Sequence, residues 1–287
     1  MGRRLPIWLK KRFSWTESWL ETREILKDLR VHTVCEAAHC PNLGECYRER
    51  TATFMILGDV CSRRCSFCAV KKGIPLPLDE EEPQRVAEAA YRLGLKYAVV
   101  TSVTRDDLAD GGANHFVRTI KALRDRIPGV KIEVLTPDFQ GNPKAISRIL
   151  EYPPDVFNHN LETVPRLYPR VRPDADYYRS LNLLSVMKDN SRLYTKSGLM
   201  LGLGEKEEEI ILVMEDLRRR ECDFLTLGQY LSPSSLHHPV VEFLEPERFE
   251  CYRQMALTLG FSAVTAGPFV RSSYHARQLF SLPAGEK

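Results

Sequence analysis

Six of the eight cysteines of this 287-residue chain lie within one stretch of 34 residues, from Cys35 to Cys68. They form two triplets of different spacing: C-x4-C-x5-C at Cys35, Cys40 and Cys46, and C-x3-C-x2-C at Cys61, Cys65 and Cys68. Three thiolates leave a metal ion or an iron–sulfur cube one ligand short of four, and an open position is where chemistry takes place. The chain must therefore fold so that two incomplete thiolate sites can form.

The spacing of the second triplet favours an iron–sulfur cluster over other uses of cysteine. A structural zinc site usually takes two C-x2-C pairs separated by a dozen or more residues, which neither triplet matches. A disulfide framework is also disfavoured, because the chain is long and carries no secretion signal. A buried core thiol is the remaining alternative, and we assign it to the isolated cysteines Cys222 and Cys251.

Apolar strand-like runs alternate with helix-like segments along most of the chain. We expect strands at 51–57, 96–101, 130–135, 155–160, 197–203, 223–228 and 262–266. We expect helices at 14–30, 80–94, 113–127, 142–151, 175–190, 205–220 and 246–260. This alternation predicts βαβ units with a parallel sheet, and the number of units favours a partial (β/α)6 barrel of the TIM type.

The predicted barrel divides the chain into three parts. Residues 51–267 form the barrel, 1–50 an N-terminal extension with the first cysteine triplet, and 268–287 a C-terminal extension. We expect both extensions to close over the active-site face, and residues 31–50 to contain little regular structure. Because the second triplet follows the apolar run 51–57, its loop leaves the carboxyl end of a strand, where α/β barrels carry their active sites.

Polar residues gather at other predicted strand ends. Asn158, Asn160 and Glu162 alternate along a strand and so share one face, either to bind a ligand or to form an internal polar network. Gly198, Gly202 and Glu205 mark another strand end, where glycine allows close backbone approach but is also ordinary in turns.

Three further groups have less definite roles. Arg105, Asp106 and Asp107 follow a strand and lie over the active-site face or cap a helix. The arginines between Arg166 and Arg179 form a solvated basic loop or contact a carrier protein or cluster. His237 and His238 carry no metal-ligand spacing and are expected at the surface.

With these motifs in place, the chain resembles the radical S-adenosylmethionine (SAM) superfamily, through C-x3-C-x2-C after the first strand. Within it, the chain resembles the lipoyl synthase family through CEAAHCPNLGEC, TSVTRDDLADGGA, FNHNLETV, SGLMLGLGE and RSSYHA. The resemblance implies that Cys61, Cys65 and Cys68 hold the [4Fe–4S] cluster that binds and reduces SAM. It implies an auxiliary [4Fe–4S] cluster on Cys35, Cys40 and Cys46, completed by a serine of RSSY. That serine maps to Ser272 or Ser273, and we choose Ser273.

The same resemblance implies a reaction and partners. Two molecules of SAM would supply 5′-deoxyadenosyl radicals that remove hydrogen from C6 and C8 of a protein-bound octanoyl-lysine. The auxiliary cluster would donate two sulfur atoms, giving the lipoyl cofactor. The partners would be an octanoylated carrier protein (an E2 subunit or the glycine-cleavage H protein), an electron donor and an iron–sulfur carrier that rebuilds the cluster. The alternatives are a sulfur-inserting enzyme of the biotin synthase or methylthiotransferase kind, and a non-catalytic iron–sulfur or zinc protein.

Charge and hydropathy exclude some partners. The net charge of +3 is too small to favour nucleic-acid binding. No apolar stretch approaches the roughly 18 residues that a membrane span needs, and the opening residues are too short and polar for a secretion signal. We therefore expect a cytoplasmic enzyme that binds neither membrane nor nucleic acid.

Overall fold

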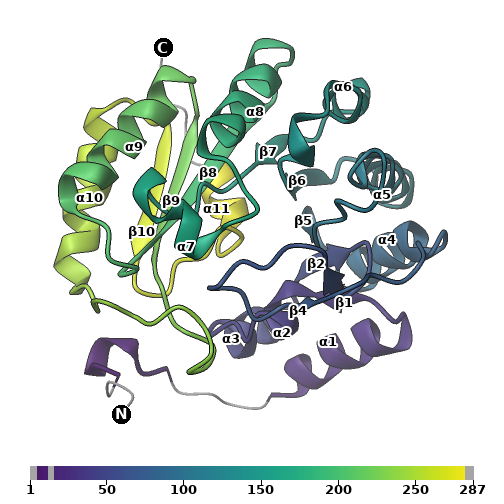
Figure 1. Ribbon diagram of the computed structural model, residues 1–287. Helices are drawn as coiled ribbons and strands as arrows, with labels where there is room; N and C mark the ends of the chain where they lie inside the picture. Colours follow the sequence, from purple (N-terminus) through teal and green to yellow (C-terminus); the bar gives the residue numbers. More distant parts are fainter. Residues whose placement is uncertain (1–4, 12–15, 282–287) are drawn as a thin grey trace. The chain divides into compact units, whose positions relative to one another are not determined.

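The structure is a computed structural model that describes residues 5–11 and 16–281. The chain forms two compact units. The N-terminal unit comprises residues 16–64 and 69–157, and the C-terminal unit comprises residues 5–11, 65–68 and 158–281. Strands and helices alternate along the chain in both units (Figure 1). The fold is therefore α/β, as the sequence predicts.

The N-terminal unit is built on three parallel strands, which pair in the order β2 (Thr53–Ile56), β5 (Tyr97–Ser102) and β6 (Lys131–Leu135). The short strand β1 (His32–Thr33) pairs antiparallel with β2. The chain enters β7 (Val156–Asn158) beside β6, because Asp155 N donates to Ile132 O over 2.9 Å. A separate pair of two-residue strands, β3 (Val60–Cys61) and β4 (Lys71–Lys72), brackets the second cysteine triplet.

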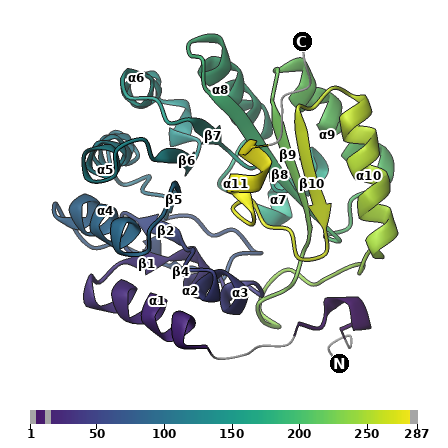
Figure 2. The ribbon, with the colours of Figure 1, turned by 180° about the vertical axis from the view of Figure 1, so that it is seen from behind.

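Helices connect these strands and bury one face each, as expected for βαβ units. They are α4 (Glu82–Arg92), α5 (Ala113–Arg126) and α6 (Pro143–Glu151), which follow one another in Figure 2. The fully buried side chains Val86, Phe116 and Ile149 show which faces form the core. A 3-10 turn, η2 (Phe139–Gly141), precedes α6.

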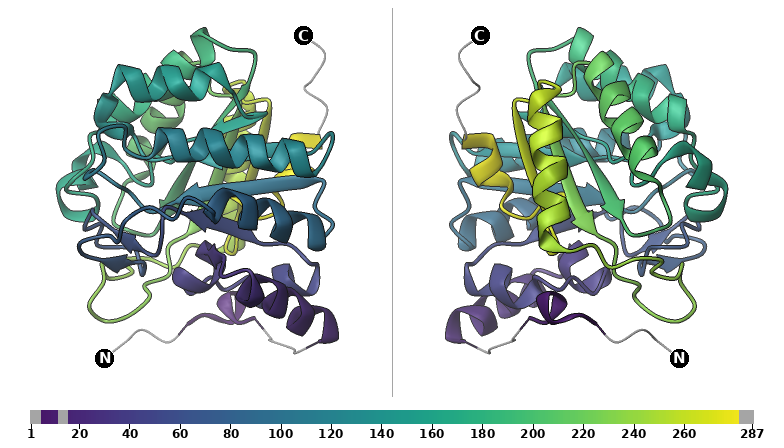
Figure 3. Two further views of the ribbon diagram at one scale, coloured as in Figure 1. Left: turned by 90° about the vertical axis from the view of Figure 1, so that its right-hand side faces the viewer. Right: turned by 90° about the vertical axis from the view of Figure 1, so that its left-hand side faces the viewer.

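The C-terminal unit contains the parallel strands β8 (Tyr194–Leu201), β9 (Phe224–Gln229) and β10 (Ala263–Gly267), paired in that order. The segment after β7 runs beside β8, where Glu162 N donates to Gly198 O over 2.9 Å. The helices are α7 (Tyr168–Val171), α8 (Tyr177–Asp189), α9 (Glu207–Arg219), α10 (Pro246–Thr258) and α11 (Ala276–Ser281). Figure 3 shows α10 lying along β10. Two 3-10 turns, η1 (Ile7–Leu9) and η3 (Pro165–Leu167), complete the unit.

Within each unit the paired strands are parallel apart from β1, which confirms the predicted, mostly parallel strand pairing. The architecture agrees with a partial barrel. Each of the seven predicted strands is present within three residues of its expected ends. That the terminal extensions close the active-site face remains a prediction.

The expectation of little regular structure in residues 31–50 is wrong. Besides β1, this stretch holds two short helices, α2 (Val34–Ala37) and α3 (Leu43–Arg48). Thr33 Oγ1 accepts a hydrogen bond from Glu36 N and is 2.9 Å from the hydroxyl of fully buried Tyr47. Helices of four and six residues are too short to show a hydrophobic period, so tertiary packing rather than sequence pattern defines them.

The first helix, α1 (Glu17–Asp28), is capped by Thr16, whose hydroxyl accepts a hydrogen bond from Trp19 N. The opening residues of its predicted range, 14 and 15, lie outside the described residues. Cys222 is fully buried, as predicted, whereas Cys251 is exposed on α10, so its assignment to the core is wrong. No helix in the described part of the chain is long and apolar enough to cross a membrane.

The turn that precedes α5 yields a stability prediction. Gly112 has a φ of 89°, and a Cβ at this position would collide with Leu57 Cδ1. Gly129 has a φ of 78° but faces open space. Gly129→Ala should cost only the left-handed penalty of about 1–2 kcal/mol. Gly112→Ala should cost about 1–3 kcal/mol more, because overpacking adds to that penalty. Denaturant unfolding of both variants measures the difference, and equal losses would contradict the packing described here.

Candidate active site

The loop that carries the second cysteine triplet starts with a left-handed turn. Leu57 has a φ of 70°, which is unfavourable for leucine, and Gly58 follows with a φ of 89°. Two side chains hold the Leu57 peptide groups: Glu82 Oε2 accepts from Leu57 N over 2.7 Å, and Arg105 Nη1 donates to Leu57 O over 3.3 Å. Buried His115 in turn lies 2.7 Å from Glu82 Oε2. The surroundings therefore fix the turn that a leucine would otherwise avoid.

The first arm of the loop, Cys61 to Arg63, is bonded to the segment after β5. Ser62 N and Ser62 Oγ both donate to Thr104 O over 3.0 Å. Thr104 N donates to Cys61 Sγ over 3.3 Å, so a backbone amide supports the first thiol of the triplet. This arm belongs to the N-terminal unit.

Arg63 anchors that arm through a buried ion triad. Its Nε and Nη2 donate to Asp106 over 2.6 and 2.9 Å, and Nη2 also donates to Asp138 over 2.5 Å. Arg63 is 5% exposed and Asp138 is 0% exposed. Burial disfavours the charged guanidinium, but hydrogen bonds to the two carboxylates raise the pKa of Arg63, so it stays charged. The sequence did not single out Arg63, although its place between two clustered cysteines is a signal.

The structure shows which contacts the charged residues of the TSVTRDD motif make. Asp106 holds Arg63, while Arg105 is buried and forms a bidentate pair with Asp107 over 2.8–3.1 Å. The hydrogen bonds from Arg105 lower the pKa of Asp107. Neither aspartate caps a helix, so that alternative is wrong: Asp110 instead accepts from Gly112 N and Asn114 N at the start of α5.

The second arm, Cys65 to Cys68, belongs to the C-terminal unit. Ser66 donates through N to Val171 O and through Oγ to Arg170 O, and its own carbonyl accepts from His238 N over 2.9 Å. His237 Nε2 lies 3.2 Å from Cys68 O. His238 is buried, with Nε2 3.0 Å from Leu203 O, so the expectation of two surface histidines is wrong. The loop that follows β9 therefore supports the cysteine backbone.

The first triplet is brought together within the N-terminal unit by α2 and α3. Cys40 N donates to Cys35 O over 3.0 Å, and Cys46 N donates to Asn42 O over 2.9 Å. Burial and the neighbouring Cys40 raise the pKa of Cys35 to about 12. Burial and the charges of Cys35 and Cys40 raise the pKa of Cys46 to about 12. Three thiols on two adjacent short helices are soft donors of the kind that an iron–sulfur cluster takes.

None of the eight cysteines is in a disulfide, so both triplets are available as thiols. Within residues 5–11 and 16–281, no three His, Cys, Asp or Glu side chains converge closely enough to hold one metal ion. An iron–sulfur cube places its ligands on separate irons, which is a different geometry from a single-ion site.

The polar residues after β7 gather in the C-terminal unit, although the strand ends at Asn158 and Glu162 has a φ of 65°. Asn160 Nδ2 donates to Glu162 Oε1 over 3.0 Å and to Ser272 Oγ over 2.6 Å. Burial raises the pKa of Glu162, opposed by the charges of Arg172 and Arg271. The structure thus joins Asn160, Glu162 and the RSSY segment, while Asn158 is fully buried.

Local packing and hydrogen bonding explain the glycines and the glutamate at the end of strand β8. Gly202 has a φ of 96°, and a Cβ there would collide with Glu242 O. Glu205 accepts from Gly202 N over 2.5 Å and Leu203 N over 2.9 Å. Burial raises the pKa of Glu205, and these backbone hydrogen bonds oppose that shift. Gly198 instead lies beside Asn160 and Ser272.

The arginines of the stretch from Arg166 to Arg179 differ in how far they are buried. Arg166 pairs with Glu209 near the surface. Arg172 is 8% exposed, and its Nη1 donates to Asn160 O and Leu161 O over 2.8 and 2.9 Å. For Arg172, the alternative of a solvated basic loop is therefore wrong.

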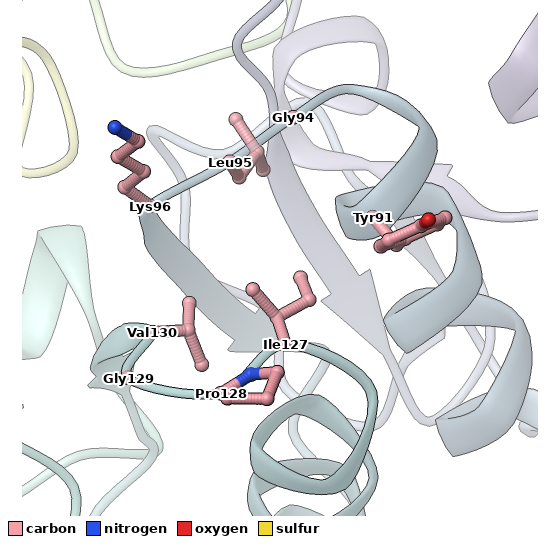
Figure 4. Close-up of a pocket in the computed structure, with 8 residues that line it drawn as sticks. All are labelled: Tyr91, Gly94, Leu95, Lys96, Ile127, Pro128, Gly129 and Val130. Atoms are coloured by element: carbon pink, nitrogen blue, oxygen red, sulfur yellow. The ribbon is translucent and has the colours of Figure 1, made fainter.

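A pocket of about 370 Å³ lies in the N-terminal unit, and Figure 4 shows the side chains that line it. Tyr91, Gly94, Leu95, Lys96 and residues 127–130 line it, at the amino ends of β5 and β6. Because cysteine-bearing loops leave the carboxyl ends of the parallel strands, this pocket is separate from the candidate active site.

Comparisons with known proteins show which family and which fold the chain is similar to. The profile of the Radical SAM superfamily matches residues 55–217. A lipoyl synthase of Caldanaerobacter subterraneus is 58% identical over 283 residues, covering 98% of this chain and 99% of that protein. A lipoyl synthase of Caldicellulosiruptor bescii is 54% identical over 272 residues, covering 94% of each.

Solved structures are similar in fold. SuiB of Streptococcus suis bound to S-adenosylmethionine matches with a TM-score of 0.59 and 11% identity, covering 78% of this chain and 52% of that one. Methylornithine synthase matches with a TM-score of 0.54 and 15% identity, covering 88% and 83%.

Arg63→Gln should destabilise the protein by about 3–5 kcal/mol, because it leaves Asp138 buried without its cation. It should also lower the iron retained after anaerobic reconstitution. Arg253→Gln is the control, since it removes an arginine from an ion pair with Glu250 near the surface. Denaturant unfolding and iron analysis of both variants test the triad. Equal stability of the two variants would show that Arg63 does not anchor the loop.

Proposed function

We propose a function for this chain from one premise: the chain belongs to the lipoyl synthase family of the radical SAM superfamily. It is a radical SAM enzyme that inserts sulfur. We propose that it inserts two sulfur atoms, at C6 and C8 of an octanoyl chain attached to a lysine of a carrier protein. The observation that carries this proposal is the pair of cysteine triplets, each one ligand short of four.

We assign Cys61, Cys65 and Cys68 to the [4Fe–4S] cluster that binds SAM. Thr104 N donates to Cys61 Sγ, and His237 Nε2 lies 3.2 Å from Cys68 O, so this loop is supported at both ends. When bound, the cluster and SAM supply the radical chemistry that unactivated C–H bonds require. The chain's own contribution is to hold three thiols on one loop and to leave the fourth position open for SAM.

We assign Cys35, Cys40 and Cys46 to the auxiliary [4Fe–4S] cluster, with Ser273 as fourth ligand and the cluster as sulfur donor. The choice of Ser273 over Ser272 is supported by Asn160, whose Nδ2 already donates to Ser272 Oγ. A serine oxygen is a hard ligand among soft thiolates and is therefore easily shed. A cluster with one weak ligand suits a role in which its sulfide is given up.

For the SAM pocket we retain Asn158, Asn160, Glu162, Gly198, Gly202 and Glu205 as candidates. Asn160 and Glu162 are the best supported, because both are polar, held together and adjacent to the RSSY segment. Gly202 and Glu205 satisfy each other's hydrogen-bonding groups, so we expect them to shape the pocket rather than contact SAM.

The proposed partners follow from the reaction. The octanoyl chain comes on a lipoyl carrier protein, either an E2 subunit or the glycine-cleavage H protein. An electron donor reduces the SAM cluster, and an iron–sulfur carrier rebuilds the auxiliary cluster after its sulfur is used.

The two triplets should have separable roles. Fully reconstituted protein should contain about eight irons and eight sulfides, as two four-iron clusters require. Cys40→Ala should lower this to about four and abolish sulfur insertion, while SAM cleavage to 5′-deoxyadenosine continues. Iron analysis and chromatography of the nucleoside products measure both. Loss of SAM cleavage in Cys40→Ala would contradict this division.

The overall function is tested by anaerobic incubation with SAM, dithionite and an octanoylated lysyl peptide. Mass spectrometry should detect a gain of two sulfur atoms on the peptide, with 5′-deoxyadenosine formed alongside. A non-catalytic iron–sulfur protein would form no 5′-deoxyadenosine. An enzyme with another sulfur acceptor would cleave SAM but leave the peptide unchanged.

A further inference from the structure

The segment that carries the RSSY motif, residues 268–275, rests on β8 and β9 at two glycines. A Cβ on Gly228 of β9 would collide with Val270 O and would come within 3.4 Å of Arg271 Nη1. A Cβ on Gly198 of β8 would lie 2.6 Å from Thr226 Oγ1, 2.9 Å from Asn160 Oδ1 and 3.2 Å from Ser272 Oγ. Both glycines have ordinary φ values, so close approach rather than turn geometry explains why they lack side chains.

Asn160 also binds this segment. Its Nδ2 donates to Ser272 Oγ over 2.6 Å, and its backbone oxygen accepts from Arg172 Nη1 over 2.8 Å. Asn160 is 7% exposed and Arg172 is 8% exposed, so water competes little for these bonds. Ser272 is therefore held by a shielded hydrogen bond from the Asn160 side chain, and Arg172 holds the Asn160 backbone in turn.

Short turns fix the rest of the segment. Val270 N donates to Gly267 O over 3.1 Å, and Tyr274 N donates to Arg271 O over 2.9 Å. Arg271 Nη1 donates to Val270 O, the same carbonyl that lies against Gly228. Because consecutive Cα atoms are only about 3.8 Å apart, a shift of the Ser272 backbone also moves the start of Ser273.

We infer that Gly228 and Asn160 are positioning residues that seat the segment 268–275 and thereby aim the Ser273 hydroxyl as a cluster ligand. This inference rests on the proposed function, which makes Ser273 the fourth ligand of the auxiliary cluster. It extends that function, because Asn160 joins the candidate SAM-binding residue Glu162 to the neighbour of the cluster ligand. Partners behind a metal ligand typically contribute 10–100-fold to metal affinity, so these contacts should be measurable.

The test compares Gly228→Ala with Gly267→Ala in the full-length, anaerobically reconstituted protein. A Cβ on Gly267 meets Val270 Cγ2 at 3.5 Å, an ordinary contact, so Gly267→Ala is a matched control on the neighbouring strand. Ser272→Ala is the second variant, because it removes the hydrogen bond from Asn160 without adding volume. The readouts are the EPR component that does not respond to SAM and the rate of iron loss to a chelator.

Gly228→Ala and Ser272→Ala should change that EPR component in the same way as Ser273→Ala, and should accelerate iron loss about tenfold or more. Gly267→Ala should match the unaltered protein. If Gly228→Ala does not fold, as judged by circular dichroism, Ser272→Ala alone decides.

The possible failures are distinguishable. If Ser273→Ala leaves the SAM-insensitive EPR component unchanged, the ligand assignment of the proposed function fails, and this inference fails with it. In a second outcome, Ser273→Ala changes the SAM-insensitive EPR component, but the folded variants Gly228→Ala and Ser272→Ala behave like the control Gly267→Ala. The assignment of Ser273 as ligand then stands, and the positioning role of Gly228 and Asn160 is overturned.

Discussion

The arrangement of the cysteine loop depends on one buried cation. Arg63 lies between the first two cysteines of its triplet and is held by Asp106 and Asp138, which belong to the segments after β5 and β6. A guanidinium this buried cannot stay charged without partners, and its planar donors fix direction as well as distance. The triad therefore ties Cys61 to the carboxyl ends of the parallel strands. With the left-handed turn at Leu57, it sets the loop's path using side chains that are not themselves ligands.

In the C-terminal unit, two glycines and the side-chain amide of Asn160 fix the path of the RSSY segment. Gly198 and Gly228 leave room for the RSSY segment, and Asn160 bonds to it directly. Asn160 and Glu162, both proposed for SAM, thus share one hydrogen-bonded group with Ser272, the neighbour of the proposed ligand Ser273.

Much of the fold was predictable, because most of the parallel strands contain an apolar run and the long helices carry an apolar face. Both cysteine triplets were evident from spacing alone. The short helices α2 and α3 were not, since they are held by contacts such as that of Thr33 with Tyr47. Nor could sequence periodicity show that His238 is buried, or that Asp106 meets Arg63 rather than capping α5. Those pairings join positions distant in the chain, and only the folded backbone brings them together.

The central claim is that each cysteine triplet holds its own cluster and that one of them binds SAM. Low-temperature EPR of the reduced protein, recorded with and without SAM, tests this claim most directly. The measurement compares the unaltered chain with the triple variant Cys61→Ala, Cys65→Ala, Cys68→Ala. The account predicts that SAM alters the spectrum of the unaltered chain, whereas the triple variant keeps about four irons and a spectrum indifferent to SAM. A triple variant that still responds to SAM, or that retains all its iron, would contradict the account.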